Sequence, residues 1–553
     1  MESILSISLF KGGKMFGSGI HEIEITLLLL IAMVALLALL AQRLRVPYPI
    51  VLLLGGLALS FLPGVPHVSL DPSFVFLVVL PPLLFASTQS IGWSDLRSNL
   101  APILTLGLGV VAFTVVGIAV FMHFFVRGFD WRTGAALGAV VSTTDIIAVA
   151  AIAKRVGLPE RILQLIEGES LINDAIGLLA LQFASAMVVS GFIPTIWEGL
   201  GRFVWLVVSG IAAGILVGVL IAQIERRMRS TALQLMVSVA TPYVAYLLAE
   251  SVHGSGVLAA VACGLYVGRL RSQGLSSRGR IESNAVWGTL DFSLNGLVFI
   301  LIGLQLPSIL EGLKGQNWAY KIWVSLLVCA LVIGLRFLWI FGTARIPVLV
   351  KKYIFRRPAE WVSTPVLTVV GWSGMRGVLT LAAALSLPAF TNAGQPFPER
   401  QSIILYAYAV ILVTLVGQGL SLPALIRKLK VFESSTAQQE VREARIAMID
   451  AGLRKLAELR EQSGSGLIRE EAFAAVENLY LERLRALKYK DESLASELED
   501  QRRTQTLQQI SYQMRQAERS ELLRIHNEGK VQYTTLRRLE RELDLLDMYA
   551  NKG

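Results

Sequence analysis

Cysteine and charge are both scarce along most of this chain of 553 residues. The two cysteines, Cys263 and Cys329, lie inside apolar runs, so the sequence shows no sign of a disulfide framework. The first 430 residues carry only 31 basic and 19 acidic side chains, whereas 42 of the last 123 residues are charged. This contrast predicts a membrane domain followed by a soluble tail.

The overall composition supports that division. The chain is 54% hydrophobic, with a mean hydropathy of +0.58. The basic excess of the apolar part is better explained by the positive-inside bias of membrane proteins than by nucleic-acid binding. We therefore predict an N-terminal segment at 1–24, a transmembrane domain at 25–430 and a cytoplasmic helical tail at 431–553.

Thirteen apolar segments are long enough to be read as membrane-spanning helices, which need roughly 20 mostly apolar residues. They lie near 25–42, 47–64, 72–90, 100–125, 133–153, 162–189, 203–223, 232–249, 252–268, 285–306, 322–344, 364–388 and 402–426. The first begins at Ile25 without a cleavage pattern, which indicates a retained helix and not a signal peptide.

The odd number of spans places the two termini on opposite sides of the membrane. With the tail in the cytoplasm and the N-terminus outside, the inside loops hold 18 lysines and arginines and the outside segments hold 8. This bias agrees with the positive-inside rule. Thirteen also divides into six, one and six, which predicts two inverted six-helix repeats, a plan common among secondary transporters.

A few charged side chains fall within the predicted spans, where each costs a few kcal/mol on insertion scales. They are Asp145, Glu167, Glu169, Asp174, Asp291, Arg336 and Arg376. Glu167 and Asp291 lie near predicted cytoplasmic helix ends, so a structural role is favoured for these two. Asp145 and Asp174 lie deeper and have polar neighbours, which favours a functional role.

The segment GESLINDAIG (168–177) carries the densest polar group. On a helix, Ser170 and Asp174 are four residues apart, as are Glu169 and Asn173, so the four side chains share one broad stripe. The preceding span contains VSTTDIIAVA (141–150), whose hydroxyls can satisfy backbone groups freed by local unwinding. Such oxygens suit a hard cation such as Na⁺, and no histidine or cysteine ligand spacing indicates a transition metal.

These motifs resemble the monovalent cation:proton antiporter-1 family, the bacterial relatives of animal sodium/proton exchangers. The resemblance covers about residues 25–430. It is carried by STTD with GESLINDAIG, by the link KRVGLPERILQLIE (154–167), by FSLNGLVFILIGLQLP (292–307) and by GWSGMRGVLTLAAALSLP (371–388). It implies an all-α polytopic membrane protein of about 13 helices in two inverted repeats, with broken, crossing helices.

The resemblance also implies roles for individual residues. The ion-binding set would be Asp174, Asn173, Asp145, Thr144 and Ser170, with Na⁺ held by Asp174, Asp145, Thr144 and Ser170. In supporting roles, Glu169 would pair with Arg336 of the eleventh span, and Arg376 would be the arginine of the broken twelfth helix.

The chain departs from the family pattern at two places. Relatives often have prolines at the positions of Thr143 and Ile146, so the break in the fifth helix is less strongly forced here. Relatives also often carry an acidic residue where this chain has Ala86, after Pro-Pro-Leu-Leu-Phe. A cation ligand from the third span is therefore missing.

The expected function is an antiporter, not an enzyme, without a cofactor. It would exchange Na⁺ (or Li⁺) for H⁺, serving pH and sodium homeostasis. Burial penalises a charged carboxylate, and either a proton or Na⁺ relieves that penalty, so competition for Asp174 produces exchange. Because Asn173 is neutral, we expect electroneutral 1:1 exchange by a homodimer in the bacterial inner membrane. A K⁺/H⁺ antiporter is the alternative, and a cation channel or a non-transporting sensor is disfavoured.

The tail at 431–553 has amphipathic helical runs interrupted by SGSG at 463–466. We predict a regulatory or dimerising helical domain, with a partly disordered appendage as the alternative. No nucleotide-binding motif occurs in it.

Overall fold

The chain forms two units in a computed structural model, residues 1–433 and 434–553. The structure describes residues 20–62, 70–89, 100–191, 195–228, 230–274, 277–313, 317–353 and 363–432, short helical pieces between 446 and 485, and residue 524. All regular elements in these ranges are helical, apart from one isolated bridge between Phe390 and Pro396. Residues 1–19 of the predicted N-terminal segment and most of the tail lie outside the described residues, whereas residues 20–24 belong to the first helix.

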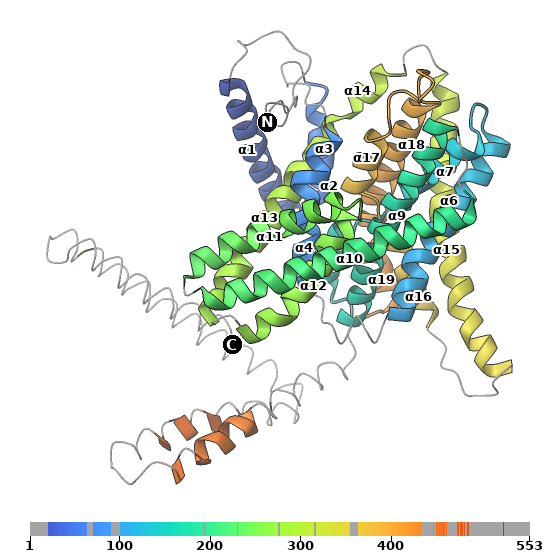
Figure 1. The fold of residues 1–553 in the computed structure, drawn as a ribbon. Coiled ribbons are helices and arrows are strands. Elements are labelled where there is room, and N and C mark those ends of the chain that lie inside the picture. The colour runs from blue at the N-terminus through green and yellow to red at the C-terminus, as the bar shows by residue number, and fades with distance from the viewer. Residues whose placement is uncertain are drawn as a thin grey trace. The chain divides into compact units, whose positions relative to one another are not determined.

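The first half of unit 1 contains the elements labelled up to α9 in Figure 1. They are α1 (Ile20–Leu44), α2 (Tyr48–Leu59), α3 (Pro72–Phe74), the π-helix η1 (Val75–Val79), α4 (Leu80–Gln89), α6 (Leu100–Phe125), α7 (Trp131–Ser142), α8 (Ile147–Val156) and α9 (Glu160–Ser190).

The second half begins with α10, the long helix that crosses the front of the view in Figure 1. Its elements are α10 (Ile196–Arg227), α11 (Thr231–Ser251), α12 (Gly256–Gly274), α13 (Ser277–Leu304), α14 (Leu306–Glu311), α15 (Trp318–Tyr353), α16 (Thr364–Trp372), α17 (Val378–Leu385), α18 (Arg400–Leu412), the π-helix η2 (Val413–Gln418) and α19 (Gly419–Leu429).

Nine helices among the described residues are long and apolar enough to cross a membrane. Three shorter apolar helices accompany them, at Leu28–Leu44, Tyr48–Leu59 and Gly256–Leu270. Large apolar side chains such as Trp197 and Met236 are well exposed on the helices, as expected of a surface that faces lipid. The predicted all-helical polytopic membrane fold is thus confirmed, whereas thirteen spans in two inverted repeats stay a prediction.

Two apolar segments are each divided into two short helices. The helix α7 ends at Ser142 and α8 begins at Ile147, so the four residues 143–146 are not helical. The helix α16 ends at Trp372 and α17 begins at Val378. The first break forms although neither Thr143 nor Ile146 is a proline, so another interaction must stabilise it.

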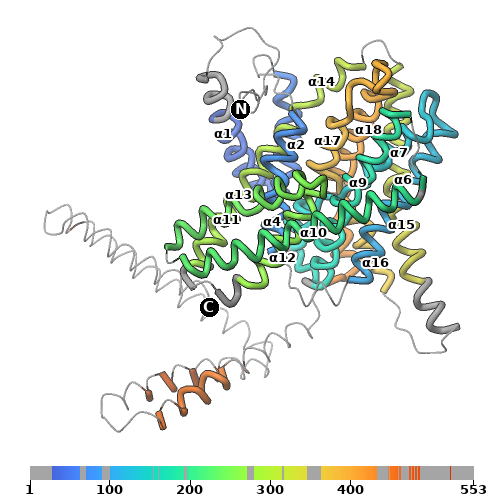
Figure 2. The backbone as a smooth tube through the Cα atoms, viewed as in Figure 1, coloured from blue at the N-terminus to red at the C-terminus, as the bar shows by residue number. Residues whose placement is uncertain are grey.

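The helix α9 lies beside α6 and α7, as the trace in Figure 2 shows. Glycines permit this approach, because a Cβ on Gly177 would lie 2.6 Å from Thr143 Cγ2 and 3.0 Å from Ser142 Oγ. The polar stripe of α9 is thereby held against the break between α7 and α8.

The helices α2 and α13 are in backbone contact through two glycines. A Cβ on Gly56 would lie 2.5 Å from the carbonyl oxygen of Ile300, and one on Gly303 would lie 2.6 Å from the backbone nitrogen of Leu57. Small residues at such crossings let membrane helices approach closely, where packing replaces the hydrophobic effect as the driving force. The pair Gly56 and Gly303 therefore fixes the position of α13 against α2.

We expect Gly303→Leu to destabilise the membrane unit, because its side chain would meet backbone atoms that cannot rotate away. Overpacking of this kind costs about 1–3 kcal/mol. The measurement is the thermal unfolding midpoint of purified protein in detergent, with Gly334→Leu as the control, since a Cβ on Gly334 meets nothing within 4 Å. Equal midpoints for the two variants would contradict the proposed close contact.

Candidate functional site

The two helix breaks meet in space, although about 230 residues separate them in the chain. The backbone N–H of Asp145 donates to the carbonyl oxygen of Met375 at 2.7 Å. The hydroxyls of Thr143 and Thr380 are 2.9 Å apart. A Cβ on Gly377 would overlap Asp145 Oδ2, so glycine is required at the start of α17. The unwound segments therefore cross in direct backbone contact.

Arg376 satisfies backbone carbonyls at both breaks and is fully buried. Its Nε donates to the carbonyl of Val141 near the end of α7 at 3.0 Å, and its Nη1 donates to the carbonyl of Gly374. Its own backbone N–H donates to Thr414 Oγ1 at 3.0 Å. Carbonyls at a helix end lack intrahelical partners, and a cation there also complements the helix dipole. Arg376 thus stabilises the crossing.

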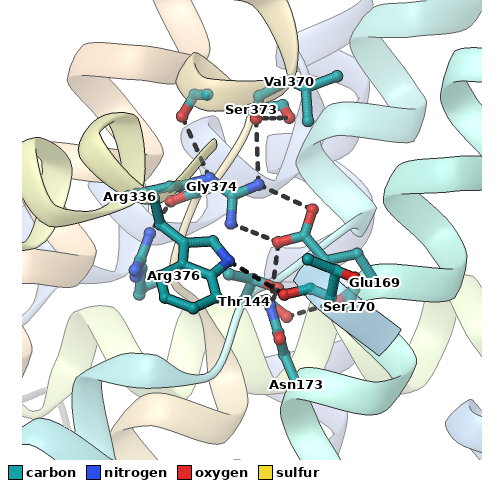
Figure 3. A network of polar contacts seen from close by, with 12 residues as sticks. Thr144, Glu169, Ser170, Asn173, Arg336, Val370, Ser373, Gly374 and Arg376 are labelled. Carbon is teal, nitrogen blue, oxygen red and sulfur yellow. Dashed lines mark hydrogen bonds and ion pairs between the residues drawn. The ribbon is translucent and has the colours of Figure 1, made fainter. Parts of the chain in front are cut away.

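Arg336 of α15 performs the same task at the end of α16 (Figure 3). Its guanidinium donates to the carbonyls of Val370 at 3.0 Å and Gly371 at 3.2 Å. The same group forms a two-pronged ion pair with Glu169, with an Nη2–Oε2 distance of 3.0 Å and a second bond from Nη1 to Oε1. Both side chains are 1% exposed. The ion pair links α9 to α15 and α16.

The polar stripe of α9 bonds to the first break, as Figure 3 shows. The amide nitrogen of Asn173 donates to Glu169 Oε1 at 3.1 Å and to Thr144 Oγ1 at 3.2 Å. Ser170 Oγ donates to the carbonyl of Thr144 at 2.7 Å. These bonds satisfy polar groups of the unwound segment and hold it beside α9.

A cavity of about 480 Å³ opens beside this crossing. Its wall includes Thr144, Asp145, Ser170 and Asp174. Asp145 Oδ1 accepts from the backbone N–H of Ile147 at 2.8 Å. Within the described part of the chain, the buried atoms Asp145 Oδ2 and Asp174 Oδ1 have no hydrogen-bond partner. Buried acceptor oxygens without donors suit a hard cation or a proton.

The structure thus brings together all the predicted site residues, with distinct positions. Thr144, Asp145, Ser170 and Asp174 lie on the cavity wall, and Ala86 lies there too. Asn173, Glu169, Arg336 and Arg376 lie behind the wall, among the residues that support the breaks. Their roles in transport remain predictions.

The sequence analysis missed some residues of the site and favoured another role for others. Neither Thr380 nor Thr414 was identified: Thr380 bonds to Thr143 of the first break, and Thr414 accepts from the backbone N–H of Arg376 in the second. Only the spacing of Thr380, four residues after Arg376, could have indicated one of them. Glu167 and Asp291, for which a structural role at helix ends was favoured, both lie on the cavity wall, as does Tyr48.

Comparison with known proteins identifies the family. Residues 29–428 match the transmembrane sodium/hydrogen exchanger family. The chain belongs to this family. Its members are cation/proton antiporters, so this sodium/hydrogen exchanger is a transporter and not an enzyme.

Two relatives illustrate the range of the match. An uncharacterised Na⁺/H⁺ exchanger of Mycobacterium tuberculosis is 32% identical over 527 residues, which cover 94% of this exchanger and 95% of that relative. A sodium, potassium, lithium and rubidium/H⁺ antiporter of Bacillus subtilis is 30% identical over 521 residues, 92% of this exchanger and 75% of that relative.

A solved structure shows the same fold. The sodium proton antiporter MjNhaP1 from Methanocaldococcus jannaschii superimposes with a TM-score of 0.59 at 19% identity, covering 74% of this exchanger and 99% of that chain.

We expect Glu169→Ala and Arg336→Ala each to destabilise this exchanger, since removing one partner of a buried pair costs about 3–5 kcal/mol. Arg336→Ala should cost more, because Val370 and Gly371 would also lose a donor. The double variant should lose less than the sum, since the two groups are coupled. The measurement is the thermal unfolding midpoint in detergent of the unchanged protein, the two single variants and the double variant.

The matched control is the exposed pair Lys455 and Glu458, whose side chains are 62% and 58% exposed. Exposed pairs contribute about 0–1 kcal/mol, so their removal should leave the unfolding midpoint nearly unchanged. Additive losses at Glu169 and Arg336 would show that the two residues do not act as a pair.

Proposed function

We propose that this exchanger moves Na⁺ (or Li⁺) against H⁺ in an electroneutral 1:1 exchange, with Asp174 as the group that carries either ion. The supporting observation is the unpaired, buried oxygen of Asp174 on the wall of a cavity between two broken helices. Membership of the sodium/hydrogen exchanger family supports Na⁺ and H⁺ as the two exchanged ions.

Competition at Asp174 provides the coupling. An ionised carboxylate in an apolar surrounding carries a large desolvation cost, which either a proton or a bound cation removes. At Asp174, the two forms with a ligand are therefore neutral, and the empty form carries one additional negative charge. Moving the empty form across the membrane barrier is penalised, so net leak of either ion is suppressed.

Thr144, Ser170 and Asp145 would complete the cation site. Ser170 bonds to the carbonyl of Thr144, and Asp145 is anchored through its backbone to Met375. These bonds tie the ligands of the first break to α9 and to the second break, so the ligands would move together when either broken helix moves. We propose that Asp145 coordinates Na⁺ with the oxygen Oδ2, since its Oδ1 is occupied by the N–H of Ile147.

Asn173 supports a stoichiometry of one for one. Its amide nitrogen bonds to Glu169 and Thr144, and an amide does not titrate. The Glu169 carboxylate is committed to Arg336. Asp174 is then the carboxylate of the α9 stripe that exchanges its proton in each cycle.

The proposed architecture is the thirteen-span plan with two inverted repeats. The four halves α7, α8, α16 and α17 form two broken helices that cross, as discontinuous helices do at transporter sites. With the N-terminus outside, the wall residues Tyr48, Glu167 and Asp291 lie near cytoplasmic helix ends, so the cavity would open inward. We further propose a homodimer in the bacterial inner membrane, with a cytoplasmic regulatory or dimerising tail.

A K⁺/H⁺ antiporter is the second candidate. The Bacillus subtilis relative is named for sodium, potassium, lithium and rubidium, so this family includes a broader cation range. Proteoliposomes with a proton gradient and Na⁺, Li⁺ or K⁺ in turn would decide between them. The same assay excludes a passive channel if ion movement saturates and requires the opposing proton gradient.

We expect Asp174→Asn to abolish exchange and leave folding intact, because the amide keeps the size of the carboxylate and removes its titration. The measurement is Na⁺-dependent proton movement in proteoliposomes. Asp130→Asn is the matched control, since Asp130 is the N-cap of α7 and asparagine also serves as an N-cap. Substantial exchange by Asp174→Asn would overturn the assignment.

We expect exchange to be insensitive to membrane potential, because a 1:1 cycle transfers no net charge. An exchanger with unequal stoichiometry would respond, since each transferred charge is worth about 2.3 kcal/mol per 100 mV. Valinomycin and K⁺ set the potential in proteoliposomes at fixed Na⁺ and pH gradients, once K⁺ is shown not to be a substrate. A steep response would mean that a second carboxylate also carries protons.

A further inference from the structure

The helix α13 presents a carboxylate and an amide to the cavity, one helical turn apart. Asn295 Nδ2 donates to Asp291 Oδ1 at 3.0 Å, and both residues lie on the cavity wall. Asn295 is fully buried, and its Oδ1 has no hydrogen-bond partner among the described residues. The bond fixes the amide so that its nitrogen faces Asp291, which leaves the carbonyl oxygen available to a positively charged ligand.

The charge of the cavity wall also favours a cation. Four carboxylates line it, from Asp145, Glu167, Asp174 and Asp291, and the lining residues that the structure describes include no lysine or arginine. When both are ionised, Asp291 and Asp145 repel each other across this wall, because like charges repel. A cation on the α13 side of the wall would relieve this repulsion, because it interacts favourably with both carboxylates.

The pair lies on a helix that packs closely against α2. The contacts of Gly56 and Gly303 hold α13 against α2, and the rings of Tyr48 and Phe292 pack with centroids 5.2 Å apart. Asp291 belongs to α13, whereas Asp145 lies in the break between α7 and α8 and Asp174 lies in α9 beside that break. The helix α4 also lines the cavity, but at Ala86 it offers no carboxylate that could bind a cation.

We propose that Asp291 and Asn295 form a second position for a monovalent cation, which captures the ion inside the cavity before it reaches Asp174. The ligands are the Asp291 carboxylate and the Asn295 amide oxygen. The inference rests on the proposed function, because capture matters only if the cavity delivers a cation to Asp174. The pair binds the ion but does not carry the exchanged proton.

The transport test compares Na⁺/H⁺ exchange by Asp291→Asn with that of the unchanged protein in proteoliposomes. The KM for Na⁺ should rise roughly tenfold, the scale on which one nearby opposite charge favours an ion, while the maximal rate at saturating Na⁺ is kept. Asp291→Glu should retain a low KM. The control is Glu282→Gln, which removes an acidic side chain of the same helix that does not line the cavity.

A second variant separates capture from a merely structural role. Asn295→Ala removes the unpaired acceptor without changing any charge, and it should raise the KM for Na⁺ by a smaller factor than Asp291→Asn. A reduced maximal rate with an unchanged KM in both variants would assign the pair to structure and overturn the proposal.

A binding test does not depend on transport. In detergent, NaCl should still stabilise Asp174→Asn against thermal unfolding relative to choline chloride, and this shift should vanish in Asp174→Asn combined with Asp291→Asn. If NaCl raised the unfolding midpoint equally in Asp174→Asn and in the double variant, the second cation position would be overturned. If the unchanged protein shows no exchange at all, the proposed function fails, and the thermal shifts still decide whether Asp291 binds Na⁺.

Discussion

Unwound backbone inside an apolar slab must find hydrogen-bond partners within the protein, and this requirement governs the centre of the molecule. Three arginines supply many of the donors. Arg336 bonds the carbonyls that end α16, Arg376 bonds those of Val141 and Gly374, and Arg400 bonds the carbonyls of Leu385 and Leu387 at the end of α17. Because each guanidinium has several donors in one plane, a single side chain can satisfy several carbonyls at once.

This requirement also explains what the sequence could and could not predict. Apolar runs of sufficient length indicated the helical segments, since length and hydropathy are local properties. The break at 143–146 was uncertain without prolines, because its stability comes from Met375, Arg376 and Ser170. These partners come from distant parts of the chain, or from another helix, and no local pattern reveals the contacts.

The candidate site likewise has features that the sequence could predict and features that depend on tertiary contacts. Asp174 and its neighbours were identified because a carboxylate within an apolar run is costly wherever it lies. Which of them face the cavity depended on tertiary structure: Asn173 proved to lie behind the wall, whereas Asp291 lies on it. The helix-end position of Asp291 in the sequence favoured a structural role, whereas in the structure the residue lies on the cavity wall.

The buried arginines lie close to the cavity without lining it, so far as its described residues show. Arg336 is committed to Glu169 and the end of α16, and Arg376 to the carbonyls of the two breaks. The positive charges that hold the breaks are thereby kept off the wall where Asp145 and Asp174 lie. A fixed arginine on that wall would neutralise Asp174 permanently and leave no reason for an ion to bind. With the arginines turned to backbone carbonyls, the charge of Asp174 is left to be balanced by what the solution provides, and in the proposed mechanism the competition between a proton and a cation for Asp174 is the basis of exchange.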